Sequence, residues 1–265
     1  MTGKKDCKMK LKLMTYNIAS CRTYKLGPDY RPVVRDFDPY IKALQGFAPD
    51  VCGLNEVDYK LPRSCRVKMA QMLGDALGYD SAFAPAVTWG LGTYGNGFIS
   101  KYKIKEMESY PIPDPEVRDE DAYYESRVIL HAVVDMDGRD VDFFVTHFGL
   151  ARAEAKNAAD TLVWLIKTAK NPVVVMGDFN LPASDPILAP IFELLQDTFT
   201  VYPDKDVYTY PSHPCITQKP EHYNKIDYIF VSRHFKVESV EIPELLLSDH
   251  KPYIANVELL DEETN

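Results

Sequence analysis

The sequence predicts an α/β fold in four layers, in which two mixed β-sheets pack face to face and helices cover their outer faces. Strand-like and helix-like runs alternate along the chain, with no low-complexity segment between them. Two segments also resemble each other: residues 12–17 form a strand-like run ending in Thr-Tyr-Asn, and residues 173–180 form one ending in Gly-Asp-Phe-Asn. Both halves continue with a loop and a helix, which favours two similar sheet layers packed together.

The first third of the chain contains two strand patterns and two helix patterns. Apolar residues that alternate with polar ones indicate strands, and apolar residues three or four positions apart indicate helices. The expected elements are a strand at 10–17, a helix that Asp38 caps and Pro49-Asp50 ends, a buried strand at 51–54 that ends in Asn55-Glu56, and a helix that Ser64 caps.

The remainder of the chain continues the alternation. Its clearest local signal is Asp137-Gly138 between two apolar runs, a dipeptide that favours the tight turn of a β-hairpin. The expected elements are strands near 80–86, 96–100 and 103–112, a hairpin of 128–134 and 141–147, a helix over 152–170, a buried strand from 173, a helix from Asp185-Pro186 to about Gln196, and strands at 226–232, 236–242 and 251–259.

Composition limits the class of protein. The 265 residues carry a net charge of −9 and 46% hydrophobic residues, which is typical of a globular chain. This charge disfavours a broad electrostatic contact with nucleic acid, although a metal ion could supply local positive charge to a nuclease. No apolar stretch approaches the roughly 18 residues of a membrane span, and the polar start has no signal-peptide core.

The cysteines and the absence of linkers complete this picture. Five scattered cysteines without a CxxC pair are typical of free thiols in a reducing compartment. We therefore expect a cytoplasmic protein, with a processed secreted chain as the alternative, and we expect a monomer. Residues 1–9 are interpreted as a tail and residues 10–260 as a single domain.

Polar residues at six predicted strand ends indicate the chemistry. Each alone has an ordinary explanation, because Asn and Asp form turns and a lone His is more often structural. An unpaired polar group inside a strand costs on the order of 1–3 kcal/mol, so we expect these groups at strand ends, in one cleft if the sheets align. The residues are Asn17, Glu56, His147, Asp178 with Asn180, Asp227, and Asp249 with His250.

Such a cleft would suit metal-assisted phosphoryl transfer. Oxygen ligands without cysteine favour Mg²⁺ or Mn²⁺ over zinc, and Glu56 is the best single ligand candidate, followed by Asn17 and Asp249. Asp227 could orient His250 through the second ring nitrogen. Phosphoryl transfer needs a metal, a positioned water and donors for the developing charge, and this set of residues contains candidates for each role.

Seven short motifs carry a resemblance to a known family. They follow one another in the family's order over nearly the whole chain, and Gly-Asp-x-Asn followed by Ser-Asp-His is the most specific pair. The chain thereby resembles the endonuclease/exonuclease/phosphatase superfamily, which has the fold of pancreatic-type deoxyribonuclease, and is similar to its bacterial single-domain members. The motifs are Thr15-Tyr16-Asn17, Asn55-Glu56, Gly95-Asn96-Gly97, Thr146-His147, Gly177-Asp178-Phe179-Asn180, Lys225-Ile226-Asp227-Tyr228-Ile229 and Ser248-Asp249-His250.

The resemblance implies a role for each matching residue. Glu56 would be the main Mg²⁺ ligand, with Asn17 and Asp249 beside it. Asp178 would orient or deprotonate the attacking water, and Asn180 would hold water and phosphate.

The same resemblance implies roles in phosphate binding. His250, paired with Asp227, would stabilise the phosphate or act as the general base, and His147 would sit near the leaving group. Arg127 would bind phosphate, against the alternative of a surface salt bridge. Asn96 would hydrogen-bond within the site, against the alternative of a turn.

These motifs predict the bond that is cleaved and leave the substrate open. We expect a Mg²⁺-dependent hydrolase of a phosphodiester or phosphomonoester, acting on a small molecule or lipid headgroup. A nuclease acting on DNA or RNA is the runner-up, and a catalytically inert binding module is the alternative of another class. Candidate substrate contacts are the aromatic loop 89–94, the acidic loop 113–125 and the basic segment 22–35. The alternative for the aromatic loop is a loop that caps the core, and the alternative for the acidic loop is a solvated surface loop.

Overall fold

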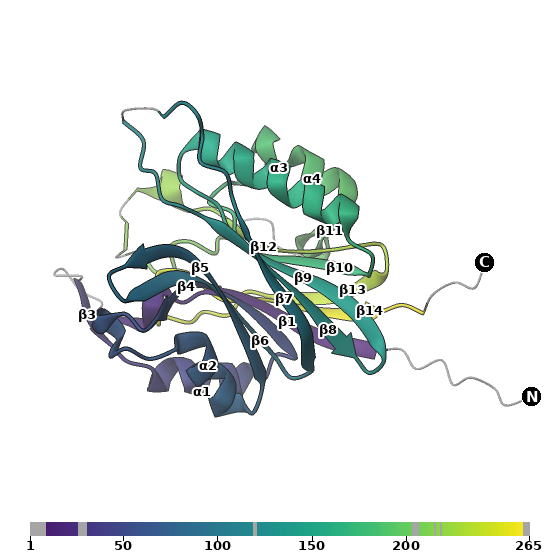
Figure 1. Cartoon of the computed structure of the whole chain (residues 1–265), viewed down its shortest axis with the longest axis horizontal. Coiled ribbons are helices and arrows are strands. Elements are labelled where there is room, and N and C mark those ends of the chain that lie inside the picture. The colour runs from purple at the N-terminus through teal and green to yellow at the C-terminus, as the bar shows by residue number, and fades with distance from the viewer. Residues whose placement is uncertain are drawn as a thin grey trace, which may run out of the picture.

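Two six-stranded β-sheets form the centre of the molecule. The computed structural model describes residues 9–25, 31–118, 121–202, 207–214, 216–217 and 219–261. Helices α1 and α2 lie outside the first sheet, and α3 and α4 lie outside the second (Figure 1). The predicted arrangement of two mixed sheets flanked by helices is therefore confirmed.

The strand orders of the two sheets are similar. The first sheet runs β13-β14-β1-β4-β6-β5 and the second runs β11-β12-β10-β9-β8-β7. In each sheet the third strand, β1 or β10, is antiparallel to one neighbour and parallel to the other. These are the two strands whose sequences resemble each other.

The elements have the following bounds. The first sheet consists of β1 (Met9–Asn17), β4 (Val51–Tyr59), β5 (Asp80–Trp89), β6 (Gly92–Ser100), β13 (Phe235–Glu241) and β14 (Tyr253–Leu259). The second consists of β7 (Lys103–Pro111), β8 (Val128–Met136), β9 (Arg139–His147), β10 (Val173–Asp178), β11 (Gln196–Asp197) and β12 (Asp227–Val231). The helices are α1 (Asp38–Phe47), α2 (Met69–Leu77), α3 (Arg152–Thr168) and α4 (Ala189–Leu194), and β2 (Arg22–Lys25) pairs with β3 (Arg31–Arg35).

Three apolar layers hold the sandwich together. Between the sheets, Phe98 of β6 meets Phe143 of β9 with ring centroids 5.4 Å apart. The second layer joins the outer face of the second sheet to α3 and α4, and the third joins the first sheet to α1 and α2. All six residues of β10 are buried, because a strand covered on both faces has no solvent-facing side. Burial of this kind is the main driving force for folding.

Several predicted boundaries were wrong. The strand expected at 51–54 does not stop before Asn55-Glu56, since β4 continues to Tyr59 and its register with β6 shifts between Leu54 and Val57. Of the loop expected at 89–94, only residues 90–91 form the turn of the β5–β6 hairpin, because β5 reaches Trp89 and β6 begins at Gly92. Alternating pattern alone could not predict a strand that continues through polar residues at an irregularity.

The helix starts also differ from expectation. Asp38 is the first residue of α1 and not its cap. Ser64 donates its hydroxyl to the Leu61 carbonyl in a short 3₁₀ turn, and α2 begins only at Met69. Asp185 does cap a helix through the Ile187 N–H, but this is a 3₁₀ turn (Pro186–Leu188) that leads into the short α4.

Other local predictions are confirmed. The β8–β9 hairpin turns at Asp137 and Gly138, which have φ values of 54° and 93°, as a tight turn with two left-handed residues requires. Within the described ranges, no helix is both long and apolar enough to cross a membrane.

Candidate active site

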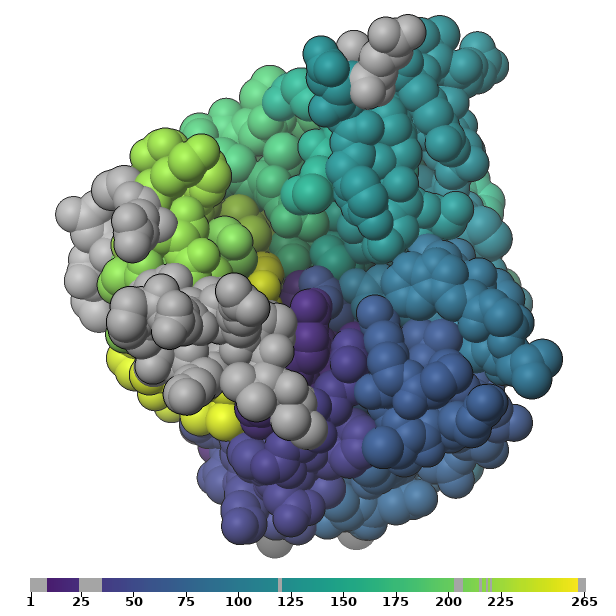
Figure 2. Space-filling model, turned by 90° about the vertical axis from the view of Figure 1, so that its left-hand side faces the viewer, coloured from purple at the N-terminus to yellow at the C-terminus, as the bar shows by residue number. Residues whose placement is uncertain are grey.

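A cleft lies where the central strands of both sheets end. β1 ends at Asn17, β9 at His147 and β10 at Asp178, so the sheets bring these side chains together. The cleft has a volume of about 420 Å³, and Figure 2 shows a hollow where differently coloured parts of the chain meet. Asp227 and Asn96 do not line it and are buried. The predicted residues that do line it are Asn17, Glu56, Arg127, His147, Asp178, Asn180, Asp249 and His250.

The backbone fixes Asp178 at the floor of this cleft. Gly177 before it has a φ of 144°, and a Cβ there would lie 1.9 Å from the Thr146 carbonyl oxygen, so the position requires glycine. The Asp178 N–H donates to Asn55 Oδ1 at 2.9 Å. Its Oδ1 accepts from the Asn180 N–H at 2.9 Å, and Asn180 adopts a left-handed φ of 51°. One carboxylate oxygen is thus used to hold the turn.

The other oxygen of Asp178 faces three donors. Asn17 Nδ2 lies 3.1 Å from Oδ2, and the Nε2 atoms of His147 and His250 each lie 3.5 Å from it. Burial raises the pKa of Asp178 to about 7, although the charge of His250 opposes the rise. A carboxyl group with a pKa near neutrality can exchange a proton at physiological pH.

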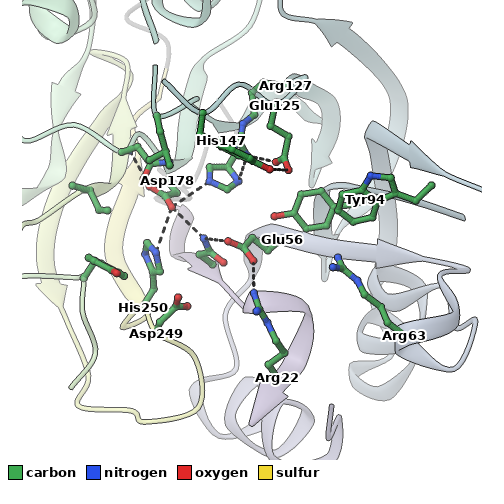
Figure 3. A pocket seen from close by; sticks show the side chains of 17 residues that line it. Arg22, Glu56, Arg63, Tyr94, Glu125, Arg127, His147, Asp178, Asp249 and His250 are labelled. Carbon is green, nitrogen blue, oxygen red and sulfur yellow. Dashed lines mark hydrogen bonds and ion pairs between the residues drawn. The ribbon is translucent and has the colours of Figure 1, made fainter. Parts of the chain in front are cut away.

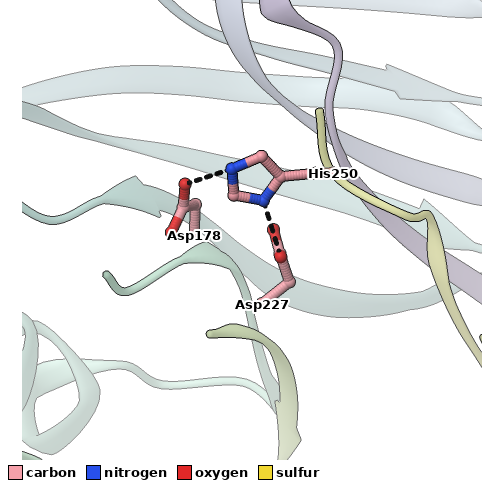
Figure 4. Close-up of side chains that lie close together, drawn as sticks. All are labelled: Asp178, Asp227 and His250. Carbon is pink, nitrogen blue, oxygen red and sulfur yellow. Dashed lines mark hydrogen bonds and ion pairs between the residues drawn. The ribbon is translucent and has the colours of Figure 1, made fainter. Parts of the chain in front are cut away.

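His250 forms a buried pair with Asp227. Its Nδ1 lies 2.9 Å from Asp227 Oδ2, while its Nε2 points to Asp178 (Figure 4). Burial lowers the pKa of His250, but the carboxylates of Asp227 and then Asp178 outweigh burial and raise it to about 10. Thr209 Oγ1 accepts from the Asp227 N–H at 3.1 Å, and the Tyr210 ring packs 5.0 Å from the imidazole. Both ring nitrogens thus face carboxylates, an arrangement that favours the imidazolium form.

His147 has the opposite character. Burial, then the charges of Arg127 and His250, lower the pKa of His147 well below 6.5. Arg127 Nη1 lies 2.9 Å from His147 Nδ1, and because a guanidinium can only donate, Nδ1 is the acceptor and Nε2 carries the proton. Arg127 is itself buried and pairs with Glu125 at 3.2 Å inside the cleft, so it is not the surface salt bridge of the alternative interpretation.

Carboxylates also gather on the side of the cleft formed by the first sheet. Glu56 sits in the irregularity of β4 with a left-handed φ of 57°, a conformation that costs energy and is common at functional sites. Its Oε1 accepts from Asn17 Nδ2 at 3.3 Å, and its Oε2 lies 3.3 Å from Arg22 Nη2. Burial and then the charge of Asp249 raise the pKa of Glu56. Ser248 Oγ donates to Asp249 Oδ1 at 3.1 Å.

The cleft contains groups that could bind a metal ion. Ligand atoms of Asp178, Asp227 and His250 lie within 4.8 Å of one another. In this trio both His250 nitrogens already face carboxylates. Glu56 and Asp249 offer a second acidic pair whose mutual repulsion a cation would relieve.

Asn55 belongs to one of the seven sequence motifs, but no role was predicted for it. It is fully buried, its Nδ2 donates to Asn96 Oδ1 and the Thr146 carbonyl at 2.8 Å each, and its Oδ1 accepts from Asp178. Asn96 in turn donates to the Val128 carbonyl at 2.8 Å. Asn96 lies within strand β6, so the alternative of a turn was wrong, and its carboxamide joins the two sheets. The position of Asn55 directly after the buried apolar run 51–54 was the available signal, since buried amides must be hydrogen-bonded.

The loops named as substrate contacts also meet the cleft. Tyr123 and Glu125 of the acidic loop line it, whereas Val117 of the same loop is exposed and residues 119–120 are outside the described ranges. Trp89 and Tyr94 of the β5–β6 hairpin line it as well. Of the basic segment, Arg22 lines the cleft, and residues 26–30 are outside the described ranges.

Comparison with known proteins assigns the class. A family model described as the Endonuclease/Exonuclease/phosphatase family matches residues 14–250, and the chain belongs to this family. Its members are hydrolases that act on phosphoester bonds, and the chain is a hydrolase of this class. The predicted family and enzyme class are therefore confirmed.

Solved structures share the fold. The chain is similar to an endonuclease/exonuclease/phosphatase from Beutenbergia cavernae, with 21% identity, a TM-score of 0.78, and coverage of 97% of this chain and 73% of that chain. A second such protein, from Bacteroides vulgatus, has 24% identity, a TM-score of 0.73, and coverage of 95% and 100%. The mannosyl-6-phosphatase of Bacteroides thetaiotaomicron has 17% identity, a TM-score of 0.67, and coverage of 93% and 99%.

Proposed function

We propose that the protein is a Mg²⁺-dependent phosphoesterase that hydrolyses a phosphomonoester or phosphodiester of a small molecule through an activated water. One observation carries this proposal. Asp178 Oδ2 faces Asn17, His147 and His250 at the floor of the cleft, and Asn17 connects it to Glu56. A carboxylate surrounded by donors, beside a separate acidic group, suits a phosphate and the water that attacks it.

In this proposal Asp178 positions the water and accepts its proton. Among these groups Asp178 Oδ2 is the acceptor that can take a proton, because His250 is held protonated between two carboxylates. The pKa of about 7 for Asp178 and of about 10 for His250 support the same division of roles. His250 then serves as the cation that stabilises the charge on the phosphate, and Asp227 positions it.

His147 and Arg127 act on the opposite side of the phosphate. The Nε2–H of the neutral His147 is a donor to the leaving group or to a phosphate oxygen. Arg127 holds the tautomer of His147 through Nη1 and adds a positive charge to the wall. Asn180 lines the cleft beside Asp178, and we retain the prediction that it binds water or phosphate.

The metal is assigned to Glu56 and Asp249, with Asn17 beside them. The chemistry of the donor atoms fits such an ion. Burial and then the nearby charge of Asp249 raise the pKa of Glu56, and two carboxylates without a thiolate match the oxygen ligands that Mg²⁺ or Mn²⁺ takes. Asn17 would contribute through its Oδ1, which now accepts from the Ala19 N–H at 3.1 Å. When bound, the ion would polarise a phosphate oxygen and offset its negative charge.

The dimensions and charge of the protein favour a small substrate. A cleft of about 420 Å³ falls in the range of small-molecule sites, and a net charge of −9 opposes a long polyanion. The mannosyl-6-phosphatase is one precedent for a phosphorylated sugar as the substrate of this fold.

A metal-supplemented substrate screen tests the proposal. The arms are sugar phosphates, inositol phosphates, phospholipids, RNA and plasmid DNA, each with Mg²⁺, with Mn²⁺ and with chelator. We expect metal-dependent hydrolysis of a small phosphoester that is lost in Asp178→Asn and retained in Glu116→Gln, an exposed acid outside the cleft. Cleavage of nucleic acid alone would refute the small-molecule assignment, and full activity of Asp178→Asn would refute the mechanism.

A further inference from the structure

One wall of the cleft is built from residues that the proposed hydrolysis does not use. Trp89 and Tyr94 of the β5–β6 hairpin stack with ring centroids 5.6 Å apart and an interplanar angle of 26°. The Arg63 guanidinium carbon lies 4.8 Å from the centroid of Trp89 and 5.4 Å from that of Tyr94. All three residues line the cleft, and we call them the arginine–aromatic wall. Figure 3 shows Arg63 and Tyr94 on one side of the cleft, across from Asp178 and His250.

Arg63 is held in place from behind. Its Nε and Nη2 donate to the two oxygens of Asp58 at 2.9 and 2.6 Å, and Asp58 is fully buried. Ser20 Oγ also donates to Asp58, at 3.0 Å. Within the part of the chain that the structure describes, Arg63 Nη1 has no hydrogen-bond partner. The guanidinium is therefore fixed on one edge and can donate from the other, as a preorganised anion site requires.

The backbone around Arg63 is built to hold this arrangement. A Cβ on Gly92 would lie 2.8 Å from the backbone of Lys60 and Leu61, so the hairpin approaches this segment as closely as glycine allows. Lys60, Cys65 and Arg66 adopt left-handed φ values of 56°, 56° and 58°. Such conformations cost free energy in residues other than glycine and cluster at ligand sites.

The wall also has an excess of positive charge. Arg63 and Arg35 approach the single carboxylate of Asp58, with Arg35 Nε at 3.8 Å, and Arg22 pairs with Glu56. Among the described residues, the two guanidinium groups of Arg35 and Arg63 thus face one carboxylate, in a protein whose net charge is −9. A local cationic excess beside an exposed aromatic surface, with 42% of Trp89 accessible, is suited to an anionic group carried on a ring.

We propose that the arginine–aromatic wall binds a second phosphate on the leaving group of the substrate, so that the preferred substrates are ring compounds with two phosphates. This inference rests on the proposed function, which places the phosphate that is hydrolysed at Asp178 and His250. The second phosphate accepts from Arg63 Nη1, and the ring that carries both phosphates lies against Trp89. The ligand recognised by the wall is a ring with two phosphates, and phosphorylated sugars and phosphorylated nucleosides are the two classes of compound that supply such a ring.

Matched pairs of substrates test this inference. Glucose 6-phosphate is compared with glucose 1,6-bisphosphate, and adenosine 5′-monophosphate with adenosine 3′,5′-bisphosphate, at fixed free Mg²⁺. We expect kcat/KM for one bisphosphate to exceed that of its monophosphate by at least about 10-fold, which is the range of a charge-assisted hydrogen bond. Arg63→Gln should abolish this preference by raising KM for the bisphosphate, with kcat little changed. Arg66→Gln, an exposed cation on the same segment outside the cleft, should retain it.

Further variants keep the test decisive if Arg63→Gln does not fold. Trp89→Leu leaves the Asp58 pair intact and should reduce the preference several-fold. Calorimetric binding of the same four compounds to Asp178→Asn gives the comparison without turnover. Equal binding of monophosphates and bisphosphates, or an equal loss for both in Arg63→Gln, would overturn the wall assignment. Failure of the proposed function would differ, because no compound would be hydrolysed while the binding preference could still be measured.

Discussion

Replacing Asp227 with Asn is the most informative test of how the site holds its charge. The side chain keeps its size, and Thr209 still accepts from the backbone N–H of residue 227. What is lost is the carboxylate 2.9 Å from His250 Nδ1. The variant therefore isolates one electrostatic contact in a fully buried position.

The size of the effect follows from the raised pKa of His250. Burial lowers this pKa, yet the carboxylates bring it from 6.5 to about 10. At 1.36 kcal/mol for each pKa unit, this corresponds to about 5 kcal/mol in favour of the imidazolium. Removing an adjacent opposite charge lowers a pKa by about 2, so the pKa of His250 should fall by about that amount in the variant. At pH 9 the imidazolium fraction would then fall about 10-fold, whereas at pH 6 it would hardly change.

Two measurements examine this expectation. Imidazole NMR of metal-free protein should show His250 titrating at least 1 pH unit lower in Asp227→Asn, and the alkaline limb of kcat/KM should move in the same direction.

The pH dependence of stability gives a third measurement, and the sign of its change can be predicted. Because the pKa of His250 is raised in the folded state, its protonation stabilises the folded protein fully below pH 6.5, and this stabilisation is lost as the pH rises toward 10. The free energy of unfolding should therefore fall over that pH range in the wild type, and fall less in the variant.

A matched control separates the charge effect from a general loss of stability. His131 and Asp142 form a second His–carboxylate pair, at 2.7 Å, in which Asp142 is buried and His131 partly buried, and which lies outside the cleft. Asp142→Asn should therefore lower stability without moving the alkaline limb. An unchanged His250 titration in Asp227→Asn, or a neutral His250 at pH 7 in the wild type, would refute the assignment of His250 as a fixed cation.

Three further predictions follow from the same geometry. Glu56→Gln should sharply reduce Mg²⁺-dependent cleavage of bis-p-nitrophenyl phosphate and raise the metal concentration needed for half activity; unchanged values would contradict the metal assignment. His250→Ala should lower kcat by at least ~10²-fold, as loss of a charge-stabilising donor does, and a near wild-type kcat would exclude that role. Gly177→Ala should lower the free energy of unfolding by more than about 3 kcal/mol in urea titrations, because the added Cβ would lie 1.9 Å from the Thr146 carbonyl oxygen. As a control, Gly46→Ala, in an open position of α1, should be neutral or stabilising by about 0.5–1 kcal/mol. Similar effects of the two changes would refute the close approach at Gly177.

Much of the fold could be predicted because its signals are local. The run 173–176 is apolar, with three β-branched valines, and it forms a strand covered on both faces, as its pattern indicated. The Asp137-Gly138 turn and the long helix α3 followed from turn chemistry and helical spacing in the same way. The wrong boundaries lie where neighbours override local pattern. β4 continues through Glu56 because β6 pairs with it on both sides of the irregularity.

Residue types at the predicted strand ends were enough to predict the order of the motifs, the class of fold and the type of bond that is cleaved, because these follow from local pattern. Which of those residues share a hydrogen bond, as when Asn17 joins Glu56 to Asp178, depends on how the two sheets pack. The same packing surrounds His147 and His250 with different charges, which shift their pKa values in opposite directions, and it brings Arg63 to the hairpin rings. Electrostatic interactions and stacking depend on distances between segments far apart in the chain, and only the packing of the two sheets sets those distances.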